Sequence, residues 1–330
     1  MKSQILIIRL SSIGDIVLTT PVVRCLKTQM ENAEIHFVTK EQYLQVVSSN
    51  PYISKVHLYS GNLRKLIHQL RQERFDYVID LQQNIRSNLI KFYFFNTPSY
   101  SYKKLTFKKL LLVRFKINRL PDIHIVDRYF GALRKFNIKN DKKGLDFFIP
   151  EGEDFSLEKL PESFSEGFIA FVIGGTWATK KLPVEKVVEI CNQISYPVLL
   201  LGGKEEEAAG EEIKSQCGSN VINLAGRCSL HQSASLVRDA KLVLTNDTGL
   251  MHVAAAFKKK ILSFWGNTVP EFGMTPYIAD PASEIMEVAD LDCRPCSAIG
   301  FSECPQKHFN CMKKQDVNKA VRWIRKNFNT

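Results

Sequence analysis

Residues 5–27 read ILIIRLSSIGDIVLTTPVVRCLK. The branched apolar run that ends near Leu10 is typical of a buried strand, and PVVRCLK has the spacing of a helix. Between them lies the turn SSIGD, and Thr20 followed by Pro21 suits a helix cap and a first helical position. A strand, a loop and a helix in this order predict a doubly wound α/β domain, which binds ligands at the carboxyl ends of its strands.

The same alternation of strand and helix continues on both sides of a break in composition. EIHFVT (34–39), SKVHLY (54–59) and DYVIDL (76–81) read as further strands, whereas 82–140 is harder to parse. Residues 140–166 are rich in Pro, Gly and acidic side chains, and strand patterns resume at FIAFVI (168–173). We therefore expect two Rossmann-like domains facing a central cleft. The expected parts are 1–155, 156–312 and a helix at 313–330 that packs back on the N-terminal domain.

Composition and length exclude several classes of protein. The chain has 330 residues, 45% apolar and 24% charged, with 21 Phe and 10 Tyr, which is too many large apolar side chains for a disordered chain. No apolar run approaches the roughly 18 residues of a membrane span. The N-terminus lacks the pattern of a signal peptide, so we expect a cytoplasmic protein. Its eight cysteines are then thiols or metal ligands rather than a disulfide framework.

Three loops at predicted strand ends carry polar residues that suit chemistry. Asp15 enters the first predicted helix, where it either points into the cleft or satisfies the helix dipole. Residues 245–257, TNDTGLMHVAAAF, place Asp247 at a turn before a helix whose free N–H groups suit a phosphate. Residues 174–183, GGTWATKKLP, add Thr176 and two lysines after another strand. The alternative for each loop is an ordinary capped or solvated turn.

Together these segments resemble glycosyltransferase family 9, the lipopolysaccharide heptosyltransferases. The resemblance rests on residues 5–27, on GGTWATKKLPVEKVVEI (174–190), on LLLGGKEEEAAGEEI (199–213) and on TNDTGLMHVAAAFKKKILSFWGNT (245–268). It implies the two-lobed GT-B architecture, with the acceptor bound by the N-terminal lobe and the nucleotide-sugar mainly by the C-terminal lobe. Asn267 and Leu182 depart from the family, since many members carry proline and tryptophan there.

The resemblance also implies roles for individual residues. Asp15 matches the catalytic base. The residues expected to bind the donor are Thr176, Lys180, Glu206, Asp247, Thr248, Gly249 and His252, and those expected near the acceptor are Ser12, Gly14, Arg86 and Arg128. A carboxylate base with the leaving group opposite predicts inversion at the anomeric carbon. A helix N-terminus and a lysine stabilise a departing diphosphate, so no metal is expected in catalysis.

The positive charge of the chain is concentrated in one region. The formal net charge is +11, and residues 61–140 alone hold 17 Lys and Arg against 5 Asp and Glu, a net charge of +12. In residues 89–116, lysines interleave with aromatic side chains, which favours an anionic membrane surface or a phosphorylated lipid-linked acceptor. A solvated basic face is the alternative. A nucleic-acid partner is not expected, because no nucleic-acid fold matches two Rossmann-like halves.

Four cysteines lie in CRPCSAIGFSECPQKHFNC, residues 293–311. The spacing of Cys293, Cys296, Cys304 and Cys311 is compatible with a structural zinc ion, with reduced thiols or with a redox-sensitive loop.

The sequence thus predicts an inverting glycosyltransferase that moves a heptose from ADP-heptose onto a lipopolysaccharide core sugar, in the cytoplasm or at the inner face of the inner membrane. Two alternatives stay open at this point. One is the same fold using another nucleotide-sugar for a different surface glycan. The other is a non-catalytic protein that binds a nucleotide or lipopolysaccharide.

Overall fold

The computed structural model describes residues 3–329 and divides the chain into two compact units. The N-terminal unit comprises the chain up to Leu105 together with Ile123–Phe148, and the C-terminal unit comprises Thr106–Asp122 together with the chain from Ile149 onward. The expected boundary at 155 therefore lies within the C-terminal unit, and one short stretch of the first half belongs to the second unit.

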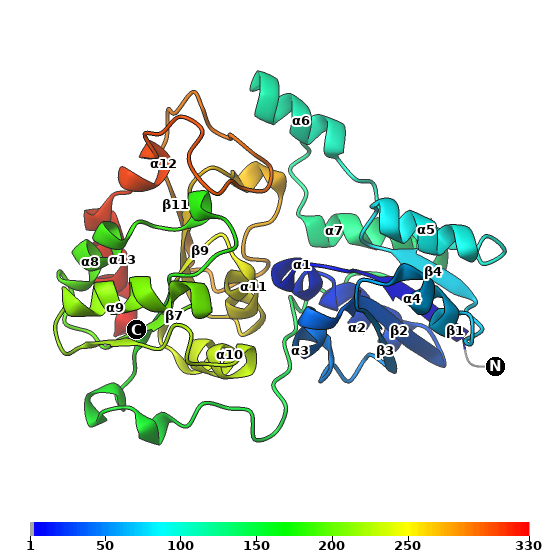
Figure 1. The fold of residues 1–330 in the computed structure, drawn as a ribbon, viewed down its shortest axis with the longest axis horizontal. Helices are drawn as coiled ribbons and strands as arrows, with labels where there is room; N and C mark the ends of the chain where they lie inside the picture. The colour runs from blue at the N-terminus through cyan, green and yellow to red at the C-terminus, as the bar shows by residue number, and fades with distance from the viewer. Residues whose placement is uncertain (1–2, 330) are drawn as a thin grey trace. The chain divides into compact units, whose positions relative to one another are not determined.

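The N-terminal unit is a parallel sheet with the strand order β3-β2-β1-β4-β5. Its strands are β1 (Ser3–Ile8), β2 (Ala33–Lys40), β3 (Lys55–Tyr59), β4 (Tyr77–Asp80) and β5 (Ser99–Ser101). Its helices are α1 (Ile13–Val17), α2 (Thr20–Gln29), α3 (Leu44–Val47), α4 (Leu63–Leu70), α5 (Ile85–Tyr93) and α7 (Ile125–Tyr129), all labelled or traceable in Figure 1. Residues Ile5–Ile8 are fully buried, as expected for a central parallel strand that is covered on both faces.

The C-terminal unit is a second parallel sheet, with the strand order β11-β10-β9-β6-β7-β8. Its strands are β6 (Ile169–Val172), β7 (Val198–Leu201), β8 (Val221–Asn223), β9 (Leu242–Asn246), β10 (Lys260–Trp265) and β11 (Glu284–Glu287). Its helices are α6 (Thr106–Phe115), α8 (Val184–Cys191), α9 (Glu207–Ser215), α10 (Leu230–Asp239), α11 (Gly249–Ala256), α12 (Asn310–Lys313) and α13 (Val317–Phe328). The expected α/β architecture of two doubly wound domains is confirmed.

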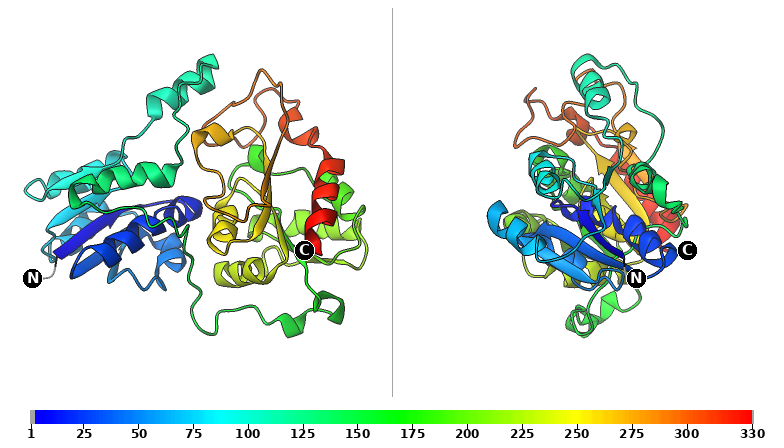
Figure 2. Two further views of the ribbon diagram at one scale, coloured as in Figure 1. Left: turned by 180° about the vertical axis from the view of Figure 1, so that it is seen from behind. Right: turned by 90° about the vertical axis from the view of Figure 1, so that its right-hand side faces the viewer.

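The C-terminal helix α13 differs from expectation. Its apolar face, which includes Val321, Trp323 and Ile324, joins the core beneath the second sheet, and the helix contacts α8 and β9. Figure 2 shows this helix, in red, beside the second sheet in a view from behind. This apolar stripe completes the core of the C-terminal unit, so the helix is part of that unit and not a separate third part of the chain. Its packing on the N-terminal domain stays a prediction.

Helix α6 is encoded within the first half of the chain but packs on the C-terminal unit. Leu112 forms a small apolar cluster with Val269 and Phe272, and Lys116 Nζ donates to the carbonyl oxygens of Cys293 (3.1 Å) and Pro295 (2.8 Å). Residues 89–116, taken as one basic aromatic stretch in the sequence, are therefore shared between the two units.

Among the described residues, no helix is both long enough and apolar enough to cross a membrane.

Candidate functional site

In both sheets the strand order reverses at one point, and the polar loops follow the strands that meet there. In the N-terminal unit the reversal lies between β1 and β4, and in the C-terminal unit between β6 and β9. Ligands of open α/β sheets bind outside the carboxyl ends of the strands at this point. Asp15 follows β1, Lys180 follows β6 and Asp247 follows β9.

Asp15 is held by contacts to both of its carboxylate oxygens. Arg9 Nη2 lies 2.6 Å from Asp15 Oδ1, and the Ser12 hydroxyl (3.0 Å) and backbone N–H (3.2 Å) donate to Oδ2. The side chain of Asp15 is 26% exposed, so a substrate hydroxyl can reach it. Asp15 is therefore both oriented and accessible, as a general base must be.

Arg9 was not singled out in the sequence, yet it organises this end of the first sheet. Its guanidinium is buried and donates to the carbonyl oxygens of Ser11 (2.9 Å) and Leu81 (2.5 Å) and to the Tyr129 hydroxyl (3.0 Å). Burial by itself lowers the pKa of Arg9, but the Asp15 carboxylate and then the Tyr129 phenol raise it above the ordinary value. Arg9 therefore remains a cation that fixes one oxygen of Asp15. An arginine at the end of an otherwise apolar strand was the available signal.

The residues expected near the acceptor are only partly brought together. Ser12 contacts Asp15, and Gly14 is buried in α1 beside it. Arg128 lies on α7 with Tyr129, and burial lowers its pKa, which the phenols of Tyr102 and Tyr129 partly offset. The Arg86 guanidinium instead lies 5.9 Å from the centre of the Tyr59 ring.

Lys104, on the segment after β5, also lies near this carboxylate. Its Nζ donates to the carbonyl oxygen of Gln83 at 2.9 Å. Burial lowers its pKa, as does the charge of Arg9, whereas Asp80 and Asp15 act in the opposite direction. Lys104 is itself an exposed residue, but these interactions place its charge in the region of Asp15.

In the C-terminal unit, two ion pairs join the loops that the sequence singled out. Lys180 Nζ lies 2.6 Å from Asp247 Oδ2, and Lys181 Nζ lies 2.5 Å from Glu206 Oε1. The Thr268 hydroxyl donates to the same oxygen of Asp247 at 2.8 Å. These contacts join the segments that follow β6, β7, β9 and β10. Polar side chains from four strand ends therefore lie together at one edge of the sheet.

Close backbone packing supports this arrangement. A Cβ added to Gly175 would lie 3.2 Å from Thr248 Cγ2, and one added to Gly174 would lie 3.1 Å from Glu206 Oε2. Thr248 caps α11, whose first residue is Gly249. His252 is buried within α11, so the alternative that it is a surface residue is wrong. Thr176 lies in the same loop as Lys180 and is exposed.

Two further residues shape this edge and were missed by sequence reasoning. The buried Asn246 amide donates to the carbonyl oxygens of Ile173 (3.3 Å) and Gly174 (3.2 Å) and accepts from the N–H of Leu182 (3.0 Å). Arg294 donates to the carbonyl oxygens of Gly266 (2.5 Å) and Thr268 (2.9 Å). Both side chains form hydrogen bonds to the backbone of segments that are distant in sequence, and no local sequence pattern predicts such contacts.

The free N–H groups at the start of α11 and the nearby Lys180 form an environment for an anion with several oxygens. Lys180 carries its charge toward the turn that begins this helix, and Asp247 positions it. A diphosphate suits this edge of the sheet, and a developing negative charge there is stabilised by fixed donors.

The four cysteines of segment 293–311 lie near one another, because burial and the thiols of Cys293 and Cys311 raise the pKa of Cys296, and burial and the thiols of Cys304 and Cys293 raise that of Cys311. Cys293 Sγ lies 3.8 Å from His308 Nε2, and the Cys296 thiol donates to the carbonyl oxygen of Cys293. All eight cysteines, which lie within the described residues, are free thiols. Zinc at this segment stays a prediction.

Comparison with known proteins agrees with the geometry. Residues 63–304 match the sequence model of glycosyltransferase family 9 (heptosyltransferase). The chain is 28% identical to lipopolysaccharide heptosyltransferase 2 of Salmonella typhimurium, over 86% of this chain and 87% of that protein. It is 25% identical to lipopolysaccharide heptosyltransferase 1 of Pseudomonas aeruginosa, over 89% and 86%.

Solved structures show the same fold. A glycosyltransferase of family 9 from Veillonella parvula superposes with a TM-score of 0.79 at 20% identity, covering 100% of this chain and 98% of that one. The ADP-heptose lipopolysaccharide heptosyltransferase II of E. coli superposes with a TM-score of 0.71 at 24% identity, covering 99% of each chain.

Proposed function

The chain belongs to glycosyltransferase family 9, and from this premise we propose that it transfers a heptose from ADP-heptose onto a lipopolysaccharide core acceptor, with inversion at the anomeric carbon. The observation that carries the proposal is the family match over residues 63–304, together with relatives named lipopolysaccharide heptosyltransferases that align over most of this chain. Its place of action would be the cytoplasm, at the inner face of the inner membrane.

Asp15 is the base of the proposed reaction. It accepts the proton of the acceptor hydroxyl as that oxygen attacks the anomeric carbon of the heptose. Arg9 and Ser12 hold the carboxylate in one orientation. The base is therefore already oriented before the acceptor hydroxyl binds. Arg128 and Lys104 supply positive charge in the same region, which suits a phosphorylated acceptor.

The C-terminal unit binds the donor in this proposal. As the bond between the sugar and the diphosphate breaks, negative charge grows on the diphosphate oxygens. We expect Lys180 and the N–H groups at the start of α11 to face that charge. We expect Glu206, which pairs with Lys181, to accept hydrogen bonds from the ribose hydroxyls. These residues supply the required stabilisation themselves, so no metal cofactor is part of the proposal.

The two alternatives are less well supported. A protein that only binds a nucleotide has no need of an accessible carboxylate held by a buried arginine. Another nucleotide-sugar would require a base pocket for a different nucleotide, whereas relatives of this chain are named for heptose transfer.

A panel of nucleotides tests the donor. We expect ADP, at about 100 times its dissociation constant, to raise the melting temperature by roughly 5 °C, because ligand binding to the native state stabilises it by mass action. UDP and GDP at the same concentration should give little shift. The measurement is a thermal-shift assay on the full chain, followed by incubation with ADP-heptose and a lipid A-linked core acceptor. Equal stabilisation by all three nucleotides would contradict the assignment of the donor.

We also propose that exposed aromatic and basic residues bring the enzyme to an anionic membrane surface. Phe92 and Phe95 of the N-terminal unit are 71% and 78% exposed, and Phe107 on α6 is 70% exposed. Lys103 and Lys108 lie in the same stretch of sequence. Aromatic rings next to lysines suit the headgroup region of an anionic bilayer.

Vesicle binding tests the contribution of these residues. Replacing Lys103 and Lys108 by glutamine should weaken binding to vesicles rich in anionic lipid by about 1 kcal/mol for each lysine that reaches the surface. Binding should also fall as salt rises, because the Debye length is about 8 Å at physiological ionic strength. The matched control replaces Lys214 and Lys326, which are exposed on the C-terminal unit, with the same change in net charge.

The measurement is co-sedimentation with vesicles, alongside activity on a short water-soluble acceptor. Lys104 is left unchanged because it lies near Asp15. Equal loss in the control pair would mean that net charge alone drives binding. Loss of activity on the soluble acceptor would instead assign these lysines to acceptor binding.

A further inference from the structure

Two buried histidines meet on neighbouring strands of the N-terminal sheet, away from the β1–β4 reversal that holds Asp15. His36 lies on β2 and His57 on β3. In the parallel register His36 pairs with Lys55, two residues before His57, so both imidazoles project from the same face of the sheet. His36 Nδ1 lies 3.0 Å from His57 Nε2.

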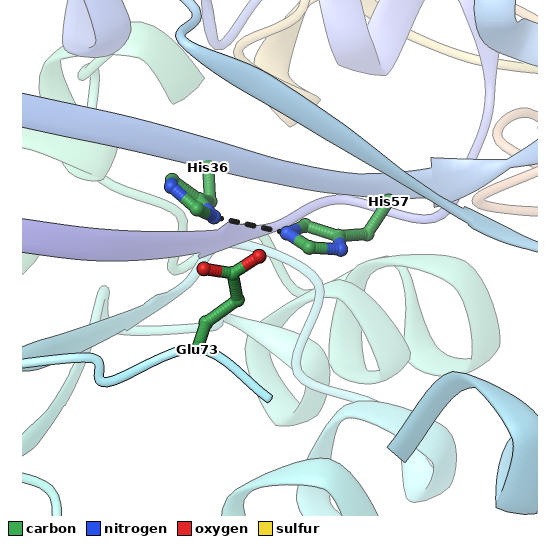
Figure 3. Close-up of side chains that lie close together, drawn as sticks. All are labelled: His36, His57 and Glu73. Atoms are coloured by element: carbon green, nitrogen blue, oxygen red, sulfur yellow. Dashed lines mark hydrogen bonds between the residues drawn. The ribbon is translucent and has the colours of Figure 1, made fainter. Parts of the chain in front are cut away.

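A carboxylate completes this group. Glu73, in the turn between α4 and β4, places an oxygen within 4.8 Å of both histidine nitrogens. Figure 3 shows the Glu73 carboxylate facing the gap between the two rings. The ring of Phe75 packs edge-on against each imidazole, with centroids 5.2 and 6.2 Å away. This packing restricts the orientation of both histidine rings.

We propose that His36, His57 and Glu73 bind a divalent transition-metal ion of the zinc class. Two imidazole nitrogens and one carboxylate oxygen are a ligand set that zinc accepts, with the fourth position left to water. Among residues 3–329, these three side chains are the group of His, Cys, Asp or Glu ligands found to converge in this way. This proposal does not depend on the glycosyltransferase activity.

The distances fit a shared ion with little movement. Two nitrogens at 2.0–2.1 Å from a tetrahedral ion lie about 3.3 Å apart, against 3.0 Å here. At present one ring donates a hydrogen bond to the other, so that ring must carry its proton on its other nitrogen when the ion binds. No proton need be lost overall. Burial lowers the pKa of both rings, that of His57 to about 4, so both are neutral at physiological pH.

Lys55 competes with the ion for Glu73. Its Nζ lies 2.5 Å from Glu73 Oε1, and its side chain is 56% exposed, so it can turn away into solvent. The same lysine therefore holds the carboxylate in place and limits its affinity for a cation.

A pocket beside the group offers a path of entry. Its volume is about 470 Å³, and its lining includes Lys55, His57 and Glu73 together with the polar side chains of Gln69 and Gln72. Room for water next to two ligands is what an open, three-residue metal site requires.

Metal titration of the tag-free full chain tests the proposal, with Zn²⁺ and Co²⁺ competed against a chromophoric chelator. We expect Glu73→Gln and His57→Gln each to weaken binding by at least 10-fold, the size of loss that even supporting residues of metal sites cause. Lys55→Gln should strengthen binding, because the competing cation is gone. His68→Gln and Glu31→Gln are matched controls on exposed residues outside this pocket and should leave affinity unchanged.

The Co²⁺ spectrum separates this site from the cysteines. Nitrogen and oxygen ligands give visible bands without the near-ultraviolet thiolate charge-transfer band, and these bands should disappear in Glu73→Gln. Glu73 and Lys55 are partly exposed, so their variants keep the test valid if the histidine variant fails to fold. Absence of binding, or binding that carries the thiolate band and is unchanged in Glu73→Gln and Lys55→Gln, would overturn the proposal.

Discussion

Turnover should fall by roughly 100-fold or more when Asp15 is replaced by asparagine, while donor binding stays close to normal. General-base catalysis contributes about 10²–10⁴ in rate. The amide oxygen of asparagine can replace only one of the two carboxylate oxygens, so it keeps either the Arg9 contact or the Ser12 contacts, and the amide cannot take the proton of the acceptor hydroxyl. Steady-state kinetics give the turnover, and the ADP-dependent shift in melting temperature reports donor binding.

Asp76→Asn is the matched control for this variant. Asp76 is an exposed carboxylate of the same unit, immediately before β4 and thus at the other end of that strand from the proposed site, where it accepts from the backbone N–H of Gln4. Its replacement should leave turnover unchanged. Near-normal turnover in Asp15→Asn would remove Asp15 from the mechanism.

Lys180→Ala should weaken donor affinity and slow turnover together, lowering kcat/KM by roughly 10- to 100-fold. A hydrogen bond to a charged group is worth about 1.5–3 kcal/mol, and each 1.4 kcal/mol is a factor of ten. The loss has a second part, because Asp247 then faces the diphosphate without its cation. Initial-rate kinetics over a range of donor concentrations separate the two parameters.

Two further variants locate the effect. The double variant Lys180→Ala with Asp247→Asn should recover part of the donor affinity, since the unpaired carboxylate is removed. Lys181→Ala should lose much less, because Lys181 pairs with Glu206 rather than with the turn before α11. If Lys181→Ala has the larger effect, the donor-binding lysine is the second of the pair.

The strands and the donor loops could be predicted because local pattern decides them. The expected strand at 34–39 corresponds to β2 (Ala33–Lys40), and 76–81 corresponds to β4 (Tyr77–Asp80). Most residues of these strands are buried, and branched or aromatic apolar side chains such as Ile35, Phe37 and Ile79 are among them, so the signal is strong. By contrast, β5 has only three residues and is largely exposed, which leaves little pattern to read. In the same region α7 ends at Tyr129 and the chain continues as a 3-10 helix.

What could not be predicted depends on contacts between distant segments. Arg9 reads as an isolated charge until the fold places the Leu81 carbonyl and the Tyr129 hydroxyl beside it. Asn246 reads as part of a turn, and only the neighbouring strand shows that its amide holds the loop after β6. His36 and His57 meet solely because β2 and β3 pair in one register.

The membership of Thr106–Asp122 in the C-terminal unit has a consequence for recombination between members of the family. The polypeptide passes between the two units three times, after Leu105, after Asp122 and after Phe148. A chimera with a single crossover near residue 148 would inherit α6 from one parent and Phe272, against which that helix packs, from the other. To exchange the two halves between family members, residues Thr106–Asp122 must therefore come from the same parent as the C-terminal sequence, although they lie within the N-terminal half of the chain.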